Sequence, residues 1–356
     1  RPSGISSAFY SITPADGSWA LWRTLAVALG IFTSVALIIM VAVVVRLLQI
    51  RRRQGGMMAT SLLMPRMASD LAGRMGSPTR MSSCYEVWHV DPKDVELMHV
   101  VGVGSYCKVW RGKWKGMEVA VKEHLLAGSS FLMDEDVKTF VCEAEMLSTL
   151  RHPHVLQFWG AAITGREMLI LTEFCALGSL RQVLGDKRIC LGFDRALLIA
   201  KQVAAGMNYL HTRAQPVVHR DLKSPNVLLT DQWVAKVADF GVARIVDERG
   251  IMTQGLGSAL WGAPEVLQRN KYSVAADVYA FGIVMWECVT RHEPYEGLSA
   301  TQVALAVVDG QRPDLSLVPT TVAPAFVELI KDCWTDLPAA RPNFHAVVER
   351  LEAIQP

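Results

Sequence analysis

The 356-residue sequence predicts an α+β fold of two lobes, a small antiparallel β-rich lobe followed by a larger helical lobe, preceded by a single transmembrane helix. Three observations support this prediction. Residues 24–45 carry no charge, residues 96–122 alternate strand-like segments with turns, and apolar side chains recur at helical spacing after about residue 194. The length and the 51% hydrophobic content suffice for a well-buried core and exclude a disordered chain.

The uncharged segment, residues 24–45, is predicted to cross a membrane. As a helix its 22 residues would extend about 33 Å, and the hydrocarbon core of a bilayer is about 30 Å thick. A buried helix of a soluble domain is a weaker alternative, because such helices are rarely apolar on every face. A cleaved signal peptide is also disfavoured, because its basic residues precede the apolar stretch and here most of them follow it.

The basic residues beside the span predict its orientation. Arg23 alone precedes it, whereas Arg46, Arg51, Arg52 and Arg53 follow it. Because positive residues stay on the cytosolic side, residues 1–23 are predicted to be an extracellular stub and residues 46–94 a basic cytosolic juxtamembrane linker. The protein is thus expected to be a single-pass membrane protein with a cytosolic body. The arginines either act only as a stop-transfer signal or also bind anionic membrane lipids.

The net charge of +2 combines two regions of opposite sign. Residues 46–80 contain seven arginines and one acid, Asp70, while residues 81–356 contain more acids than bases. The body is therefore mildly acidic, and we expect no nucleic-acid partner. All seven cysteines follow the span and none forms a close CxxC pair, which indicates neither a disulfide framework nor a zinc site.

The small lobe is predicted over about residues 95–174. Its strands are expected at 96–101, 108–114 and 117–122, because valines and aromatic residues there lie between turn residues. In the third strand Ala120 and Lys122 share one face, so a small side chain and an amine point into the same space. Residues 134–150 are expected to form a helix with acidic residues in its first turn.

The larger lobe is predicted over about residues 178–354. Ala196, Ile199, Val203, Met207 and Leu210 recur at three- and four-residue spacing, as in a helix that faces a core. Residues 274–290 are apolar on nearly every face and predict a central, buried helix. Two lobes of different composition are expected to leave a cleft in which a ligand binds.

A glycine-rich turn, GVGSYC at 102–107, connects the first two strands. A dinucleotide-binding turn would be followed by a helix, and a nucleotide-triphosphate P-loop would end in GK[ST]; neither occurs. The turn is either a plain hairpin or a place where backbone N–H groups approach phosphates. The turn alone does not decide between them.

Motifs further along the chain decide it. Gly102 and Gly104, VAVK at 119–122, Glu143, HRDLKSPN at 219–226, DFG at 239–241 and APE at 263–265 have the order of the protein-kinase signature set. From about residue 95 to 351 the sequence therefore resembles a eukaryotic protein kinase catalytic domain, which implies the bilobal protein kinase fold. The strings GKWKGMEVAVK and GSALWGAPEVL resemble the tyrosine-kinase-like group, which includes Raf-like and receptor-like serine/threonine kinases.

The resemblance implies a role for each motif residue in phosphoryl transfer from ATP, a reaction that depends mainly on holding and neutralising charged oxygens. Lys122 would contact the α- and β-phosphates and pair with Glu143. Glu143 is chosen over Glu145 because it lies eight residues before Arg151, as the helix glutamate of the family does. Asp221 would be the catalytic base, and Lys223 would neutralise the γ-phosphate. The expected ligands of Mg²⁺, for which Mn²⁺ is a possible substitute, are Asn226 and Asp239.

The resemblance also implies an adenine pocket and several structural positions. The cofactor-binding residues are expected to be Val101, Gly102, Gly104, Val109, Ala120, Lys122, Thr172, Glu173, Cys175 and Leu228. A stacked apolar spine is implied for Leu147, Phe158, His219 and Phe240, with Asp277 below it. Glu265 and Arg341 would form a buried salt bridge. Cys107 stands where the family has a third loop glycine, a change that we expect the kinase to tolerate.

Several features favour serine and threonine as the phosphorylated residues. Lys223 follows the base by two residues, and the segment 242–262 contains Thr253 and Ser258 but no tyrosine. These two residues are candidate phosphorylation sites, whose phosphates are expected to pair with Arg220. The predicted function is membrane-anchored signal transduction by phosphorylation of protein substrates, with a homodimer as a possible assembly. The alternatives are a tyrosine or dual-specificity kinase and a membrane-anchored pseudokinase scaffold.

Overall fold

The structure is a computed structural model that describes residues 88–104, 107–124, 134–163, 168–239, 244–245, 256–269 and 272–355. The chain divides into two units, Arg1–Thr79 and Arg80–Pro356, and every described residue belongs to the second. The predicted extracellular stub, the transmembrane segment 24–45 and the linker up to residue 87 lie outside the described residues. Among the residues that are described, no helix has the length and apolar character needed to cross a bilayer.

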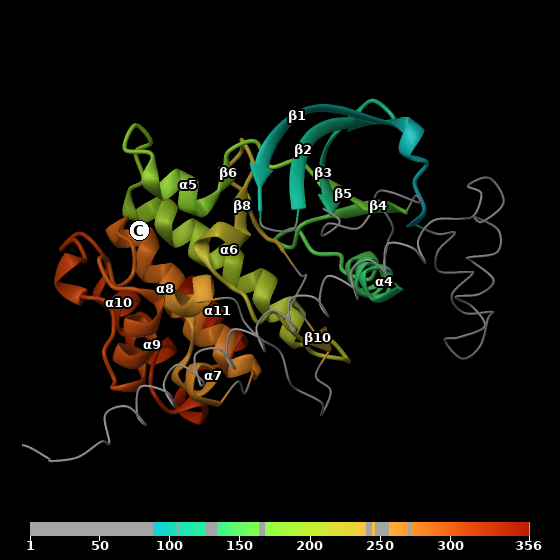
Figure 1. Cartoon of the computed structure of the whole chain (residues 1–356). Helices are drawn as coiled ribbons and strands as arrows, with labels where there is room; N and C mark the ends of the chain where they lie inside the picture. Colours follow the sequence, from blue (N-terminus) through green and yellow to red (C-terminus); the bar gives the residue numbers. More distant parts are fainter. Residues whose placement is uncertain are drawn as a thin grey trace, which may run out of the picture. The chain divides into compact units, whose positions relative to one another are not determined.

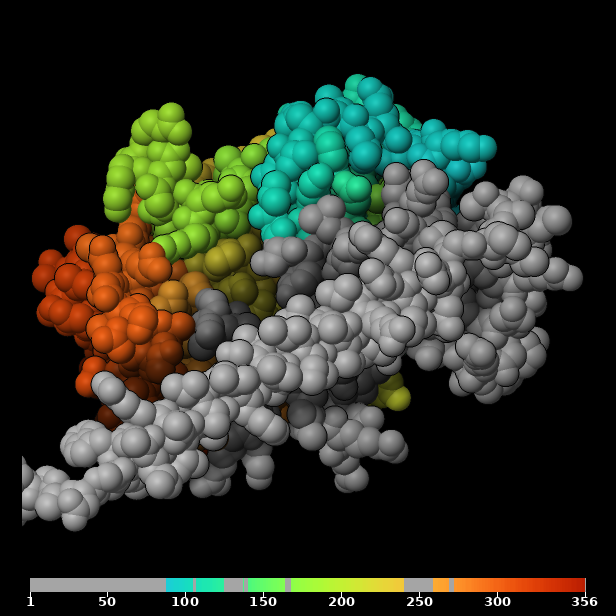
Figure 2. Space-filling view, in the orientation of Figure 1, coloured from blue at the N-terminus to red at the C-terminus, as the bar shows by residue number. Residues whose placement is uncertain are grey.

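The small lobe contains a five-stranded antiparallel sheet with the strand order β1-β2-β3-β5-β4 (Figure 1). Its strands are β1 (Val95–Val103), β2 (Cys107–Trp114), β3 (Met117–His124), β4 (Phe158–Ile163) and β5 (Met168–Glu173). The predicted antiparallel arrangement is confirmed, and each of the first three strands begins or ends a few residues beyond its predicted range. The helix α4 (Asp134–Ser148) packs against β4. The strand β1 forms an edge of the sheet, and most of its residues are exposed (Figure 2).

The two faces of this sheet have different roles, because side chains alternate along a strand. Val119 and Val121 of β3 are fully buried in an apolar cluster with Leu169 and Leu171 of β5. Val90 closes this cluster from a segment that precedes the sheet, followed by the 3₁₀ helix η1 (Pro92–Asp94). Ala120 and Lys122 lie on the opposite face of β3, which leaves the amine free to face the larger lobe.

The segment before β1 is joined to the far edge of the sheet. The Val90 amide donates to the Ala161 carbonyl of β4 at 2.9 Å, and Trp88 and Val90 are both buried. Gly160 makes this approach possible. A Cβ there would collide with Val90 and lie 2.8 Å from the Trp88 carbonyl oxygen, so a larger residue has no room.

The larger lobe is mainly helical (Figure 1). Its helices are α5 (Leu180–Gly185), α6 (Phe193–His211), α7 (Pro264–Arg269), α8 (Val274–Thr290), α9 (Ala300–Val308), α10 (Pro324–Cys333) and α11 (Phe344–Glu352). The 3₁₀ helices are η2 (Ser224–Asn226), η3 (Leu256–Trp261), η4 (Leu315–Leu317) and η5 (Pro338–Ala340). Short strands complete it: β6 (Gly178–Ser179), β7 (Val217–Val218), β8 (Val227–Leu229), β9 (Ala235–Val237) and β10 (Arg244–Ile245).

The two helices expected from periodicity are confirmed. All five residues predicted to face the core from 196 to 210 are buried in α6. The helix α8 is the central helix of this lobe, and every residue from Ala276 to Val289 is buried. It packs against α6 and α10, and its residue Asp277 accepts hydrogen bonds from the loop that precedes η2.

A buried ion pair connects α7 to the segment before α11, as the resemblance implied. The Arg341 guanidinium donates to Glu265 Oε1 at 2.7 Å and to Oε2 at 2.9 Å. It also donates to the carbonyls of Ala275, Thr335 and Asp336, and it lies over the Tyr279 ring. All of these acceptors are therefore held by a single side chain.

Candidate active site

The structure brings Lys122, Glu143 and Asp239 together between the two lobes. Lys122 Nζ lies 3.2 Å from Glu143 Oε1 and 3.1 Å from Asp239 Oδ1. Lys122 comes from β3, Glu143 from α4, and Asp239 from the segment after β9. One amine thus joins the sheet, the helix of the small lobe and the larger lobe.

The charges of this group reinforce one another. Burial lowers the pKa of Lys122, but the neighbouring carboxylates of Asp239 and Glu143 outweigh it and raise this pKa above its usual value. Burial raises the pKa of Asp239, whereas the charge and hydrogen bond of Lys122 lower it to a net value below the usual one. Lys122 therefore stays positive and Asp239 negative at neutral pH.

A second group surrounds Asp221 in the loop between β7 and η2. Lys223 Nζ lies 2.8 Å from Asp221 Oδ2. The Asn226 amide nitrogen donates to the Asp221 carbonyl at 2.8 Å and to Asp221 Oδ2 at 2.9 Å. The carboxylate of Asp221 is thus fixed between an amine and an amide on the same loop.

Asp277 of α8 holds this loop from below. Its carboxylate accepts the backbone N–H of His219 at 2.8 Å and that of Arg220 at 2.9 Å. His211 Nε2 lies 2.8 Å from the same carboxylate. His219 Nε2 in turn lies 3.0 Å from the Ala238 carbonyl, next to Asp239. A buried acid therefore sets the position of Asp221 and, through His219, that of Asp239.

The backbone is strained at two of these positions. Arg220 and Asp239 adopt φ values of 68° and 63°, in the left-handed region that residues other than glycine rarely occupy. Arg220 directly precedes Asp221, and Asp239 is itself a residue of the site. Strain of this kind persists only where surrounding contacts impose it, and the hydrogen bonds to Asp277 and Lys122 supply those contacts.

The side chains of Asn226 and Asp239 suit a hard divalent cation. The hydrogen bonds that the structure describes for the Asn226 side chain all use its nitrogen, so its oxygen is available as a ligand. Asp239 adds a carboxylate that remains ionised. Two oxygen donors from the protein are typical of Mg²⁺ sites, in which phosphates and water complete the coordination. The described residues contain no cluster of three histidine, cysteine or acidic side chains placed for a metal.

Most of the expected nucleotide-binding residues of the small lobe lie on the three neighbouring strands β1, β2 and β3, and Gly104 directly follows β1. Gly102 is paired with Val109, and Val109 with Lys122. The Gly104 N–H donates to the Cys107 carbonyl at 2.8 Å, which closes the turn. Val101 lies on β1 and is exposed. Burial raises the pKa of the Cys107 thiol, so that thiol stays protonated at neutral pH.

The remaining expected residues of the adenine pocket lie where the lobes connect. Thr172 of β5 is paired with Ala120 of β3. Cys175 packs in one apolar cluster with Leu156, Ala238 and the partly buried Leu228 of β8. Burial also raises the pKa of Cys175 to about 12.

Glu173 of β5 has its carboxylate occupied by protein partners. It accepts the Gln157 N–H at 2.7 Å and lies 2.9 Å from Lys236 Nζ. Its backbone N–H donates to the Gln157 carbonyl at 2.9 Å. The side chain of Glu173 therefore braces the connection between the lobes.

Other expected positions are only partly described. Leu147, Phe158 and His219 are buried, whereas Phe240 lies outside the described residues. Thr253 also lies outside them, and Ser258 falls in η3 without a described side chain. The two candidate phosphorylation sites thus remain predictions.

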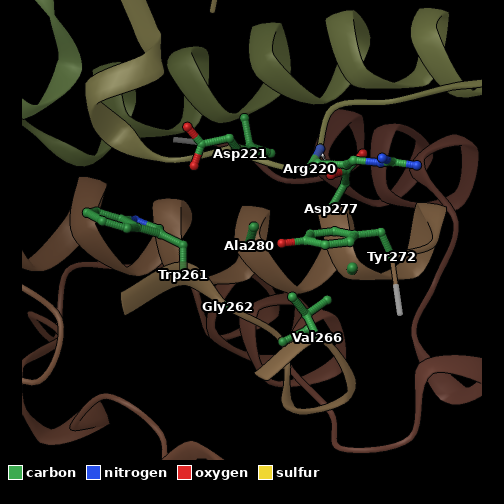
Figure 3. Close-up of a pocket in the computed structure, with 11 residues that line it drawn as sticks. Arg220, Asp221, Trp261, Gly262, Val266, Tyr272, Asp277 and Ala280 are labelled. Carbon is green, nitrogen blue, oxygen red and sulfur yellow. Dashed lines mark hydrogen bonds between the residues drawn. The ribbon is translucent and has the colours of Figure 1, made fainter. Parts of the chain in front are cut away.

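A pocket beside Asp221 contains residues that the motifs did not predict. Trp261, Val266, Tyr272 and Ala280 line it together with Asp221 (Figure 3). The buried Tyr272 hydroxyl makes no hydrogen bond within the described part of the chain, and burial together with the charge of Asp221 raises its pKa to about 12. The position of Trp261 shortly before the APE motif is the sequence signal that could have identified this wall.

Comparison with known proteins agrees with this geometry. The family described as protein tyrosine and serine/threonine kinase matches residues 95–351. A "Probable serine/threonine-protein kinase" of Dictyostelium discoideum is 38% identical over 281 residues, which are 78% of this chain and 37% of that protein. A serine/threonine-protein kinase of Arabidopsis thaliana is 37% identical over 268 residues, 75% of this chain and 46% of that protein. The chain thus spans less than half the length of these relatives.

Proposed function

We propose that this chain, which belongs to the protein tyrosine and serine/threonine kinase family, transfers the γ-phosphate of ATP to serine and threonine hydroxyls of proteins. The observation that carries the proposal is the joint placement of two groups. Lys122, Glu143 and Asp239 form one ion-paired group, and Asp221, Lys223 and Asn226 form the other. Each of these positions carries the residue that the protein-kinase motifs require, which argues against a pseudokinase scaffold.

The proposed mechanism assigns a task to each of these residues. Lys122, oriented by Glu143, binds the α- and β-phosphates. Asp221 accepts the proton of the attacking hydroxyl, and its carboxylate is held in place by Asn226 and by Asp277 through the backbone. Lys223, already 2.8 Å from Asp221, neutralises negative charge on the phosphoryl group as it moves.

Asn226 and Asp239 would hold Mg²⁺, or Mn²⁺ in its place. The cation, when bound, supplies positive charge to the phosphate oxygens. The residues of the protein fix where it binds, because Asn226 is tied to Asp221 and Asp239 to Lys122.

An assay of phosphate transfer tests this proposal. The full-length chain is incubated with [γ-³²P]ATP and a general protein substrate, in parallel with Asp221→Asn and Lys122→Met. We expect both variants to lose at least about a hundredfold in rate, the usual cost of removing electrostatic stabilisation or a positioned base. Equal incorporation by all three proteins would refute the mechanism.

Serine and threonine specificity is supported by Lys223, two residues after the base, and by the names of the relatives. Phosphoamino-acid analysis of the product tests it. Phosphoserine and phosphothreonine should dominate. Phosphotyrosine as the main product would instead support the tyrosine-kinase alternative, and comparable amounts of all three would support dual specificity.

We also propose that the kinase is anchored in a membrane and acts in signal transduction with its catalytic domain in the cytosol. The uncharged run at 24–45 and the arginines after it support this proposal. The test is carbonate extraction of membranes from cells that express the full chain. The protein should stay in the pellet, and a variant without residues 24–45 should be released. Release of both proteins would refute the anchor.

Phosphorylation of Thr253 or Ser258 is proposed to activate the enzyme by pairing with Arg220. Arg220 is placed next to the base, and its guanidinium lies 5.5 Å from the centre of the Tyr272 ring. A double variant, Thr253→Ala with Ser258→Ala, should have reduced activity. Full activity of this variant would refute the proposal.

A further inference from the structure

His124 is a histidine of the small lobe that the proposed mechanism does not use. It is the last residue of β3, two positions after Lys122, so both side chains lie on the same face of the strand. Its partner on β2 is Cys107, the first residue of that strand. The imidazole ring therefore lies beside the phosphate-binding amine, at the end of β3 that adjoins the glycine-rich turn.

Two residues of α4, Phe140 and Glu143, contact this ring. The rings of His124 and Phe140 meet edge to face, with centroids 5.3 Å apart and planes at 86°. His124 Nε2 lies 4.0 Å from Glu143 Oε2. Because Phe140 and Glu143 are three residues apart, they lie on the same face of the helix. The histidine thus contacts the face of α4 that carries the partner of Lys122.

Glu143 presents its two carboxylate oxygens to two different nitrogens. Oε1 lies 3.2 Å from Lys122 Nζ, whereas Oε2 faces His124 Nε2. At 4.0 Å the second contact is too long for a hydrogen bond, and the buried Nε2 has no hydrogen-bond partner among the described residues. Only 8% of the Glu143 side chain is exposed, so solvent screens this contact little. A movement of about 1 Å would turn it into a charge-assisted hydrogen bond, whose usual length is about 2.8 Å.

The groups that face His124 keep its ring uncharged at neutral pH. Burial lowers its pKa most and the charge of Lys122 lowers it further, while the carboxylates of Glu143 and Asp239 oppose these effects. On the neighbouring strand the Cys107 thiol, whose pKa is raised by burial, is protonated and adds no charge. The pKa of His124 therefore lies below its usual value, and the ring gains a proton only in acid.

A proton on His124 would change the partners of Glu143. An uncharged imidazole leaves the carboxylate to Lys122, whereas an imidazolium is a second cation that attracts Oε2. Because the ring is packed against Phe140, the carboxylate is the group that moves to close the gap. That movement lengthens the contact between Oε1 and Lys122 Nζ, and the imidazolium also repels the amine directly.

We infer that His124 is a positioning residue: uncharged, it seats α4 against β3 and leaves Glu143 to orient Lys122, and protonated, it competes with Lys122 for that carboxylate and weakens the hold on the ATP phosphates. This inference rests on the proposed binding of ATP by Lys122. It makes the affinity for ATP depend on pH through a residue that is assigned neither to the nucleotide nor to the cation.

Steady-state kinetics of the full-length chain test the inference. The KM for ATP is measured from about pH 8 to about pH 5.5, a range that spans the usual pKa of histidine, about 6.5. His124→Phe keeps an aromatic ring against Phe140 but does not titrate, and His124→Gln gives the same comparison with a smaller side chain. The rise in KM on acidification should be about tenfold larger in the wild type than in either variant, because an interaction with a charged group is weakened only there.

The matched control is His99→Phe, the same substitution at an exposed histidine of β1. It should keep the full rise of the wild type. Protonation of ATP itself is common to all of these proteins and cancels in the comparison. Equal rises in the wild type and the His124 variants, or loss of the rise in His99→Phe, would overturn the inference. Absence of phosphate transfer by the wild type would instead refute the proposed function.

Nuclear magnetic resonance tests the coupling without any turnover. The chain has nine histidines, and in protein labelled with ¹³C-histidine the signal of His124 is assigned by its loss in His124→Phe or His124→Gln. Because Lys122 lowers the pKa of His124 and Glu143 raises it, Lys122→Met should raise this pKa and Glu143→Gln should lower it. Unless the two shifts have these opposite signs, the inference is overturned, whether or not the protein transfers phosphate.

Discussion

Replacement of Arg341 by methionine should destabilise the larger lobe more than any loss of a surface charge. The guanidinium makes two hydrogen bonds to Glu265, at 2.7 and 2.9 Å, and three to backbone carbonyls, at 2.8, 2.9 and 3.1 Å. Methionine has a similar length but no donor. Glu265 and the three carbonyls would lose this partner, and Glu265 would be left as a largely buried, unpaired acid.

The magnitude follows from these contacts. Removal of one partner of a buried ion pair typically costs about 3–5 kcal/mol. In a domain of this size a loss of 1 kcal/mol lowers Tm by about 2–4 °C, so Arg341→Met should lower Tm by roughly 10 °C. Calorimetry or circular dichroism of the full-length chain measures this change, and urea unfolding gives the free energy.

The matched control makes the same substitution at an exposed pair. Arg350 lies 2.8 Å from Asp332, and 40% and 50% of these side chains are exposed. Arg350→Met should therefore cost less than about 1 kcal/mol. Because the penalty comes from an unpaired acid, Arg341→Met combined with Glu265→Leu should be more stable than Arg341→Met alone. If Arg341→Met were no worse than Arg350→Met, the reasoning from buried pairing would be refuted.

Three further predictions concern other parts of the structure. Burial in α8 raises the pKa of Glu287 to about 7 from a usual 4.5, so its stabilising contribution is complete below pH 4.5 and is lost as the pH rises through 7. Between pH 4.5 and 8 the wild type should therefore lose about 3 kcal/mol of unfolding free energy that Glu287→Gln does not lose. A difference between the two proteins that stays the same at every pH in urea titrations would contradict this. Gly160→Ala should cost about 1–3 kcal/mol, because the added Cβ collides with Val90, and an unchanged Tm would show that the segment before β1 can move away. If Asn226 holds the cation as proposed, Asn226→Ala should raise the Mg²⁺ concentration needed for half-maximal activity at least several-fold, and an unchanged requirement would contradict its role as a ligand.

Sequence patterns predicted the elements whose periodicity is simple. The helix α8 is apolar on nearly every face and is buried, and the alternation in β3 placed Lys122 opposite Val121. The choice of Glu143 over Glu145, which rested on the resemblance to the family, also agrees with the structure, because Glu143 Oε1 lies 3.2 Å from Lys122 Nζ. A local sequence pattern is enough to predict which face of a helix or strand is buried when that element packs against a single neighbouring element.

The hydrogen bonds that Glu287 accepts from Ser224 and Trp261 could not be predicted in this way. The residues that meet there belong to α8, η2 and η3, and no local pattern relates segments so far apart in the chain. Glu287 itself lies in an apolar run, where a single acid indicates burial but not its partners. Tyr272 likewise follows no motif, and only the packing of its neighbours places it beside Asp221.

The contact of Trp88 and Val90 with β4 shows that the folded unit begins earlier in the chain than the stretch that matches the family. The family match begins at residue 95, yet the apolar cluster beneath Val119 and Val121 is closed by Val90. A fragment cut at residue 95 would expose the back of the strand that carries Lys122. A force applied to the chain before residue 88 would therefore act directly on the sheet that carries Lys122.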